Sequence, residues 1–425
     1  MKQFVSKIWH SSSARNVGKL LSANVIAQAI GLLIYPILTR IYAPEDFGLL
    51  NLFLSIGGVL IIPATMQYQH AIPVAAKDNE AKGAFHAGMI CLVACCVLLI
   101  LLSFLATPIS RLFEAPDLAD YLWLMPIYAF SAGLWQLVSN WYIRRKAFGR
   151  ISRYQIVQNV LSAGGKIGLG HWVVPGGLLC GGIGALTVAG IGSFIIGWSK
   201  QISSLYSCKK EDVRNAFRSF RNYPRYVMPS SLLNAVNCNI AVWMITPFFG
   251  LENIGYWGMA MFLAYTPIGL IADSIYQVLL QNVSTKVSTK QPLGNMFVDY
   301  VKRCASVVIP FFALLYVITP WLVRVLLGDG WEDTAQMIRY FLPWLALYFF
   351  SLPWDFLPNL FEKQSTYLII EFILLLSRLL AIGVGWYVNN LTVVVVAYSM
   401  VSALVVLVQL IWYGRLVENY NQRCQ

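Results

Sequence analysis

Two basic side chains lie deep inside apolar stretches of this sequence, where a charge requires an explanation. Lys166 lies past the middle of the stretch 154–174. Arg378 lies near the middle of the stretch 366–388. A lysine or arginine inside a membrane costs ~2.5–3.5 kcal/mol or more, so such residues usually serve a function. If both face one cavity, they form a paired basic site suited to a phosphate or diphosphate. In the alternative, each neutralises a buried acid or extends to a membrane surface.

Two acidic residues lie at similar depth and could carry a coupling ion. Glu371 precedes Arg378 by two helical turns, about 10 Å along one helix face. Asp273 lies in the apolar stretch 255–280. Either carboxylate could carry a transported proton, and each could equally be satisfied by a neighbouring lysine or tyrosine. We expect no cofactor, and coupling to protons or to sodium ions stays open.

The first apolar stretch carries neutral polar groups and ends in an arginine. Asn24 and Gln28 are one helical turn apart. They predict either a polar stripe that lines a sugar-binding cavity or hydrogen bonds between helices. Arg40 follows beside an acidic turn, where we expect it to pair across the turn or to act in gating.

A cluster of basic residues, Arg144, Arg145 and Lys146, precedes the stretch that contains Lys166. Such a cluster fixes topology and attracts lipid headgroups, and it could form a cytoplasmic entrance for an anionic lipid carrier. The eight cysteines are scattered, and no pair of cysteines or histidines has the spacing of a metal site. We therefore predict no metal site.

The elements that carry these residues are apolar helices. Hydrophobic residues make up 58% of the 425 residues and charged residues 12%, which excludes a soluble protein. The apolar stretches are too continuous for the alternating strands of a membrane barrel. Stretches of the ~20 residues that cross a bilayer recur about twelve times. The predicted spans are 17–39, 46–66, 84–106, 120–140, 154–174, 177–197, 226–248, 255–280, 299–326, 334–358, 366–388 and 391–413.

The net charge of +12 reflects topology rather than nucleic-acid binding. Most lysines and arginines fall in alternate connections between the predicted spans, which are the cytoplasmic ones by the positive-inside rule. Both termini are then cytoplasmic. The stretch 35–40 offers no cleavage site of small residues, so we expect no cleavable signal peptide. The connections predicted to lie outside are short, which argues against catalysis on that side.

Two sequence similarities indicate a duplication. The turn Glu45–Gly48 recurs as Glu252–Gly255, each time between two apolar stretches. The acidic residue at the new helix start suits the helix dipole and can cap free N–H groups. In addition, the stretch 161–173 resembles the stretch 376–388.

Duplicated halves of six helices each predict a transporter architecture. The halves run parallel, so they form a V around a central cavity with the substrate between them. The fold class is therefore an all-α multi-pass membrane protein. We predict an N-terminal half at 1–200, a basic cytoplasmic linker at 201–225 and a C-terminal half at 226–425. A scaffold protein that no longer transports is the alternative.

Short motifs at the first turn and in the basic segment before the stretch 154–174 resemble a known family. Pro36-Ile37-Leu38-Thr39-Arg40, Pro44-Glu45-Asp46-Phe47-Gly48 and Arg145-Lys146-Ala147-Phe148-Gly149 are similar to sequences of the Wzx-type polysaccharide biosynthesis flippases. These flippases belong to the multidrug/oligosaccharidyl-lipid/polysaccharide exporter (MOP) superfamily.

The resemblance implies a function. A Wzx-type protein would move undecaprenyl-diphosphate-linked repeat units of O-antigen lipopolysaccharide or capsule across the bacterial inner membrane by alternating access. The implied partners are this lipid-linked oligosaccharide, membrane lipid, a polysaccharide polymerase and a chain-length regulator. On this reading the substrate-binding residues are Lys166, Arg378, Asn24, Gln28 and Arg40, and Asp273 and Glu371 couple an ion.

Two other functions compete with this one. A multidrug or cation antiporter of the same superfamily should have an acid-rich cavity, whereas the deep charges here are mixed and basic. A polysaccharide polymerase or a lipid-linked glycosyltransferase usually has a large outside loop, and no such loop is predicted. The sequence therefore favours a transporter over an enzyme.

Overall fold

The computed structural model describes residues 31, 33–170, 172, 176–197, 205 and 207–424. All regular secondary structure in these residues is helical, which confirms the predicted all-α class. The predicted polar stripe of Asn24 and Gln28 lies outside the described residues, as does most of the first predicted span.

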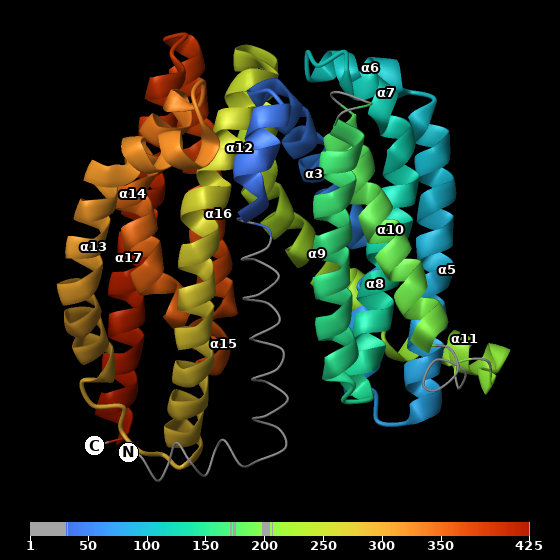
Figure 1. Cartoon of the computed structure of the whole chain (residues 1–425). Coiled ribbons are helices and arrows are strands. Elements are labelled where there is room, and N and C mark those ends of the chain that lie inside the picture. The colour runs from blue at the N-terminus through green and yellow to red at the C-terminus, as the bar shows by residue number, and fades with distance from the viewer. Residues whose placement is uncertain are drawn as a thin grey trace. The chain divides into compact units, whose positions relative to one another are not determined.

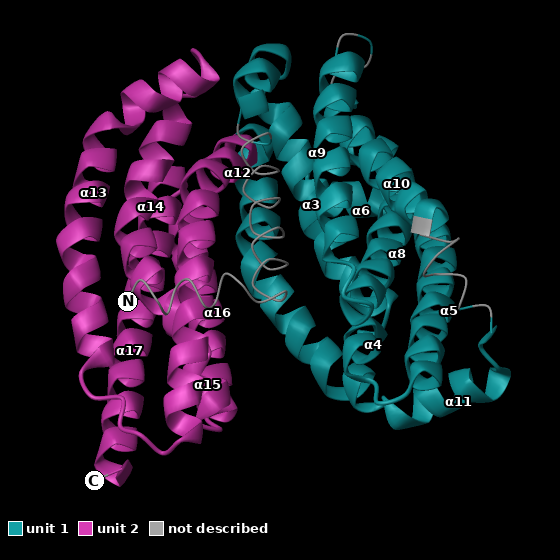
Figure 2. Ribbon diagram, turned by 60° about the horizontal axis from the view of Figure 1, so that its bottom comes forward, with its two compact units in different colours: residues 1–252 teal, residues 253–425 magenta. Residues whose placement is uncertain are grey.

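The chain divides into two compact units, residues 1–252 and residues 253–425 (Figure 2). Helix α12 (Met228–Ser288) contains the boundary between them. The helices before α12 are α3 (Pro44–Ala64), η1 (Tyr68–His70), α4 (Ala71–Val74), α5 (Asp78–Ser103), α6 (Ala106–Leu112), α7 (Leu118–Tyr121), η2 (Leu122–Leu124), α8 (Met125–Arg144), α9 (Phe148–Gly170), α10 (Gly177–Gly197), α11 (Lys210–Ser219) and η5 (Tyr223–Val227). Those after it are α13 (Met296–Leu327), α14 (Glu332–Ser351), η6 (Leu352–Trp354), α15 (Leu357–Leu360), α16 (Gln364–Tyr387) and α17 (Leu391–Cys424).

Every predicted span after the first overlaps a long helix of the described chain (Figure 1). The exact number of twelve crossings is not established. Eight helical segments are long and apolar enough to cross a membrane within the described residues, and α9 and α14 are not among them. Large apolar side chains are exposed along α5, α13 and α16, where lipid can cover them. The chain is therefore a multi-pass membrane protein.

The acidic turn begins α3 with a side-chain cap. The Ala43 N–H donates a hydrogen bond of 2.9 Å to Asp46 Oδ2. Glu45 and Asp46 both lie in the first turn, where a negative charge favours the helix dipole. Glu45 lies in the first turn, as the sequence predicts, and its neighbour Asp46 forms the capping bond.

The second copy of the turn is a break inside α12. This helix has 61 residues, far more than the ~20 that one crossing needs. Gly250 has φ 83° and ψ 171°, a conformation that favours glycine, and it separates two helical segments. The two predicted spans 226–248 and 255–280 thus correspond to the two segments of α12.

Two aromatic clusters fill the interiors of the units. In residues 1–252, Trp141 is fully buried and packs with Phe85 and Leu137. In residues 253–425, Trp354 is fully buried between Phe297 and Tyr300. The first cluster packs against the start of α9, which carries Lys166, and the second packs against α12, which carries Asp273.

The predicted linker contains a packed helix. Helix α11 lies against α5 (Figures 1 and 2). The contact is close, because an added Cβ on Gly83 would meet the backbone carbonyl of Asp212. The boundary between the two compact units lies after Glu252, whereas the sequence predicts a linker at 201–225 between the halves. The limits of the two six-helix halves stay a prediction.

Candidate functional site

Helix α9 carries a stripe of polar residues that are partly buried. Gln155, Ser162 and Lys166 follow one another at helical spacing and are half-buried. On the opposite face, Val157 and Val160 are 42% and 52% exposed. Exposed apolar residues beside a half-buried polar stripe are typical of a membrane helix that lines a polar interior.

Lys166 is the charged residue of this polar stripe. Its aliphatic chain lies over α10, since a Cβ added to Gly182 would come within 3.4 Å of Lys166 Cε. Its carbonyl oxygen accepts a hydrogen bond of 2.6 Å from the Tyr42 hydroxyl. None of the ion pairs among the described residues includes Lys166. A role of Lys166 in binding an anionic substrate stays a prediction.

The position of Lys166 depends on a close crossing of α9 and α10. A Cβ added to Gly181 would lie 2.5 Å from the main-chain nitrogen of Lys166 and 2.6 Å from the carbonyl carbon of Gly165. Only glycine allows the two backbones to approach in this way. The glycine-rich sequence of these two helices predicts such packing, and the structure confirms it at this crossing.

We expect Gly181→Val to force α9 and α10 apart. Overpacking of this kind costs about 1–3 kcal/mol, so the purified protein should unfold at a lower temperature in detergent. Gly184→Val is the matched control, because a Cβ on Gly184 of the same helix meets nothing within 4 Å. Equal unfolding temperatures for the two variants would contradict the close crossing.

Arg378 is held inside the second unit. It is 7% exposed, and its Nε donates a hydrogen bond of 3.0 Å to Ser402 Oγ. The guanidinium carbon lies 4.7 Å from the ring centre of Tyr398 and 5.3 Å from that of Trp344. The contacts join α14, α16 and α17 through hydrogen-bonding and cation–π interactions. A role of Arg378 in binding substrate stays a prediction.

Asp355, a carboxylate that stands out little in the sequence, has several polar contacts in the second unit. Asp355 Oδ1 accepts a hydrogen bond of 2.7 Å from the Tyr413 hydroxyl. The Tyr367 hydroxyl donates to Asp355 Oδ2 at 3.3 Å and also contacts the Glu371 carboxylate. The signal in the sequence was an aspartate within the predicted span 334–358.

The two acids predicted to couple an ion have different surroundings. Glu371 shares Tyr367 with Asp355, in agreement with the alternative that a tyrosine satisfies it. Asp273 is exposed on α12, and no ion pair of the described chain includes it. Their role in coupling stays a prediction.

Arg40 caps the helical segment that precedes α3. Its Nη1 donates a hydrogen bond of 2.8 Å to the Pro36 carbonyl, one turn earlier. A cationic group at this end suits both the free carbonyl groups and the helix dipole. Within the described residues Arg40 forms no ion pair across the turn. Its gating role stays a prediction.

The basic cluster is partly occupied by contacts within the protein. Arg144 pairs with Asp78 at 2.9 Å and donates hydrogen bonds to the carbonyls of Ile72 and Ala75. Arg145 pairs with the other oxygen of Asp78 at 3.2 Å. These bonds tie the end of α8 to the start of α5. Lys146 is exposed, and an entrance role for the cluster stays a prediction.

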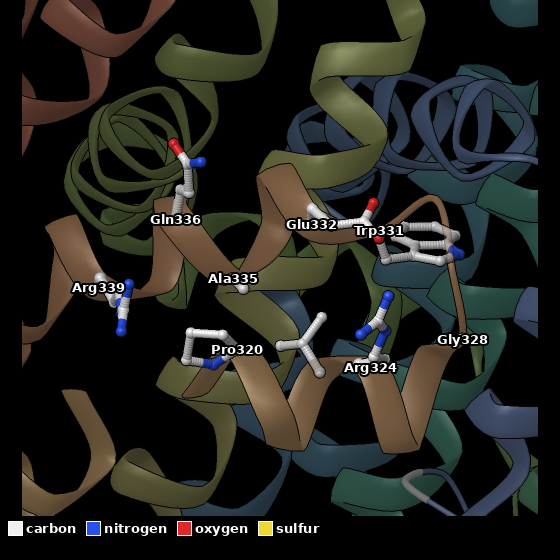
Figure 3. A pocket seen from close by; sticks show the side chains of 9 residues that line it. Pro320, Arg324, Gly328, Trp331, Glu332, Ala335, Gln336 and Arg339 are labelled. Atoms are coloured by element: carbon white, nitrogen blue, oxygen red, sulfur yellow. The ribbon is translucent and has the colours of Figure 1, made fainter. Parts of the chain in front are cut away.

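A pocket of about 320 Å³ in the second unit lies between α13 and α14 (Figure 3). Two arginines line it, with Arg339 at the opposite end from Trp331. Arg324 pairs with Asp329 at 3.1 Å. Arg339 donates a hydrogen bond of 2.8 Å to the carbonyl of Tyr316. Both cations therefore already have protein partners.

Several solved structures share the fold of this chain. A multidrug resistance MATE family transporter of the MOP superfamily, in an inward-facing conformation, has a TM-score of 0.70 at 15% identity, over 93% of this chain and 96% of that chain. The lipid II flippase MurJ, in an inward closed conformation, has a TM-score of 0.72 at 14% identity, over 95% and 90%. A MOP superfamily transporter from Pyrococcus furiosus has a TM-score of 0.62 at 14% identity, over 97% and 98%. The chain has the fold of the MOP superfamily transporters.

A family model gives the narrower assignment. The model described as polysaccharide biosynthesis protein matches residues 37–336, so the chain belongs to this family. The resemblance seen in the motifs of the first turn is thereby confirmed. No curated protein has a matching sequence.

Proposed function

We propose that this protein is a flippase for lipid-linked oligosaccharides. It moves undecaprenyl-diphosphate-linked repeat units of O-antigen or capsule from the inner to the outer leaflet of the bacterial inner membrane. The family assignment and the transporter fold support this function. The observation that carries it is Lys166, a cation without an ion-pair partner among the described residues on the polar stripe of α9.

The chemistry of the stripe fits the two polar parts of this substrate. Lys166 binds the diphosphate, since an ammonium group pairs strongly with phosphate oxygens where water is scarce. Neutral groups such as Gln155 and Asn159 contact sugar hydroxyls. The buried Gln155 Oε1 accepts no hydrogen bond from the described residues. The polyprenyl tail stays in the lipid, because exposing it to water is costly.

Arg378 is the second cation proposed for the diphosphate, and Arg40 acts as a gate. Asp273 and Glu371 are the proposed sites of proton or sodium coupling. A polysaccharide polymerase and a chain-length regulator are the proposed partners after translocation.

Transport by the purified protein in lipid vesicles tests the function. The vesicles contain polyprenyl-diphosphate-linked oligosaccharide on their inner face. A lectin added outside detects the sugar that crosses to the outer face. We expect the rate at which the sugar appears outside to be about ten-fold or more above the rate in protein-free vesicles. This ratio corresponds to a free-energy barrier that is lower by ~1.4 kcal/mol or more. An imposed pH or sodium gradient should change the rate if transport is coupled.

A cationic dye in the same vesicles tests the competing antiporter. Movement of the dye without movement of the lipid-linked oligosaccharide would contradict the proposed flippase. Equal rates with and without both gradients would exclude coupling through Asp273 or Glu371.

A further inference from the structure

The first unit contains a polar pocket whose lining does not include Lys166. It has a volume of about 540 Å³ and lies among the end of α3, η1, the last turns of α8 and the start of α12. We call it the amide pocket, after its lining residues Gln67, Gln69, Gln136, Asn140 and Asn234. Its volume is within the range of small-molecule sites, ~300–1,000 Å³.

The amide pocket has no charged lining group. Asp, Glu, Lys and Arg are absent from the residues that line it among those described. Partial burial lowers the pKa of His70, so this ring is neutral at physiological pH. A phosphate, carboxylate or ammonium ligand would find no partner charge here. The lining instead suits an uncharged ligand with many hydroxyl groups, because amides both donate and accept hydrogen bonds.

Hydrogen bonds hold several of these amides in place before any ligand binds. The Thr65 hydroxyl donates to Gln69 Oε1 at 2.6 Å. Gln69 Nε2 lies 3.2 Å from both Gln67 Oε1 and Gln136 Oε1. Gln67 and Gln69 are buried at 4% and 3% exposure. A fixed network of this kind reduces the entropy that binding would cost.

The backbone at this point adopts an unfavourable conformation. Met66 and Gln67 have φ values of 49° and 61°, in the region that residues other than glycine rarely occupy. Such strain concentrates at functional sites. Here it allows a sharp turn after α3 that brings Gln67 and Gln69 beside Gln136 of α8.

The network leaves hydrogen-bonding capacity for a ligand. Gln136 uses its Oε1 as an acceptor, and no bond of the described chain uses its Nε2 protons. Across the pocket, Asn234 and Ser231 lie on α12. Trp243 of the same helix donates a hydrogen bond of 2.9 Å to Ser55 of α3, which anchors this side of the pocket.

We propose that the amide pocket binds the uncharged sugars of the lipid-linked substrate, separately from the cation that holds the diphosphate. This inference rests on the proposed function. The connection between α3 and α5 is predicted to be cytoplasmic, so the pocket lies at the side from which the substrate enters. The pocket would thus select the sugar before translocation.

Binding of sugar without lipid or phosphate tests the proposal. The probe is the oligosaccharide released by mild acid from the polyprenyl-diphosphate lipids of the host strain. We expect Gln136→Met and Asn234→Leu in the full chain to weaken its binding about 3–10-fold each, the loss of a typical hydrogen bond. Binding of sugar-free undecaprenyl diphosphate should not change, because no charged group is removed.

Matched controls make the same chemical changes elsewhere. Gln364→Met at the start of α16 and Asn359→Leu in α15 alter exposed amides outside the pocket, and they should leave sugar binding unchanged. If Gln136→Met does not fold, Ser231→Val takes its place. Wild-type sugar affinity in the pocket variants, or no sugar binding by the wild type, would overturn the proposal. Failure of the flippase function is a separate result, seen as no transport by the wild type in vesicles.

Discussion

Lys166→Ala should reduce export of surface polysaccharide about 10–100-fold in a strain that lacks the native protein. The reason is the loss of a charge-assisted contact to the diphosphate, which contributes about 1.5–3 kcal/mol. Lys166→Gln should be as defective, because it keeps the polar chain but removes the charge. Lys166→Arg should retain most export. The measurement is surface polysaccharide per molecule of protein in the membrane, followed by lectin detection in vesicles.

The control for Lys166 is a lysine with no place in the proposed site. Lys302 is exposed on α13, so Lys302→Ala should export at the wild-type level. Normal export by Lys166→Ala, at equal protein level, would remove the diphosphate contact from the mechanism. Loss of export with unchanged unfolding temperature would separate a substrate role from a structural one.

Arg378→Ala should destabilise the protein by about 3 kcal/mol. It removes a hydrogen bond to a charged group and two cation–π contacts, and it leaves a cavity between α14, α16 and α17. Arg378→Lys should recover only part of this loss, because an ammonium group cannot stack on Tyr398 as a planar guanidinium does. Thermal or denaturant unfolding of the purified protein in detergent measures both effects.

Variants of its partners separate structure from substrate binding at Arg378. Ser402→Ala removes one hydrogen bond, so it should cost about 1–2 kcal/mol and leave export intact. Arg303→Ala, at an exposed position of α13, is the control for loss of an arginine. If Arg378→Ala unfolds like the wild type but fails to export, the residue acts on the substrate and the packing explanation is wrong.

The membrane helices could be predicted from the sequence because lipid contact requires apolar residues over a fixed length. Apolar runs do not mark the ends of helices. Helix α5 begins at Asp78 rather than at 84, since its first polar turn continues the helix out of the lipid. The predicted span 334–358 overlaps α14, which begins earlier, at Glu332, and ends at Ser351, because Pro353 and Pro358 break the regular hydrogen bonding.

The candidate site could be predicted only where one residue was itself unusual. Lys166 and Arg378 are conspicuous as charges in apolar stretches. The surroundings of Arg378 were not predictable, because Ser402 and Tyr398 come from another helix. The amide pocket was also missed, since Gln69 and Asn234 are ordinary in sequence and meet only through the fold. Its one local signal was a run of polar residues after α3.

The polar stripe of α9 also bears on how the protein is made. When α9 leaves the ribosome, its face with Gln155 and Lys166 makes insertion into lipid alone unfavourable. Helix α10 follows after a short connection and fits against it at Gly165 and Gly181. We expect the two to enter the bilayer as a hairpin, so that the polar face of α9 does not meet lipid. Gly181→Val should then also lower the yield of inserted chain in the cell, through degradation of nascent protein.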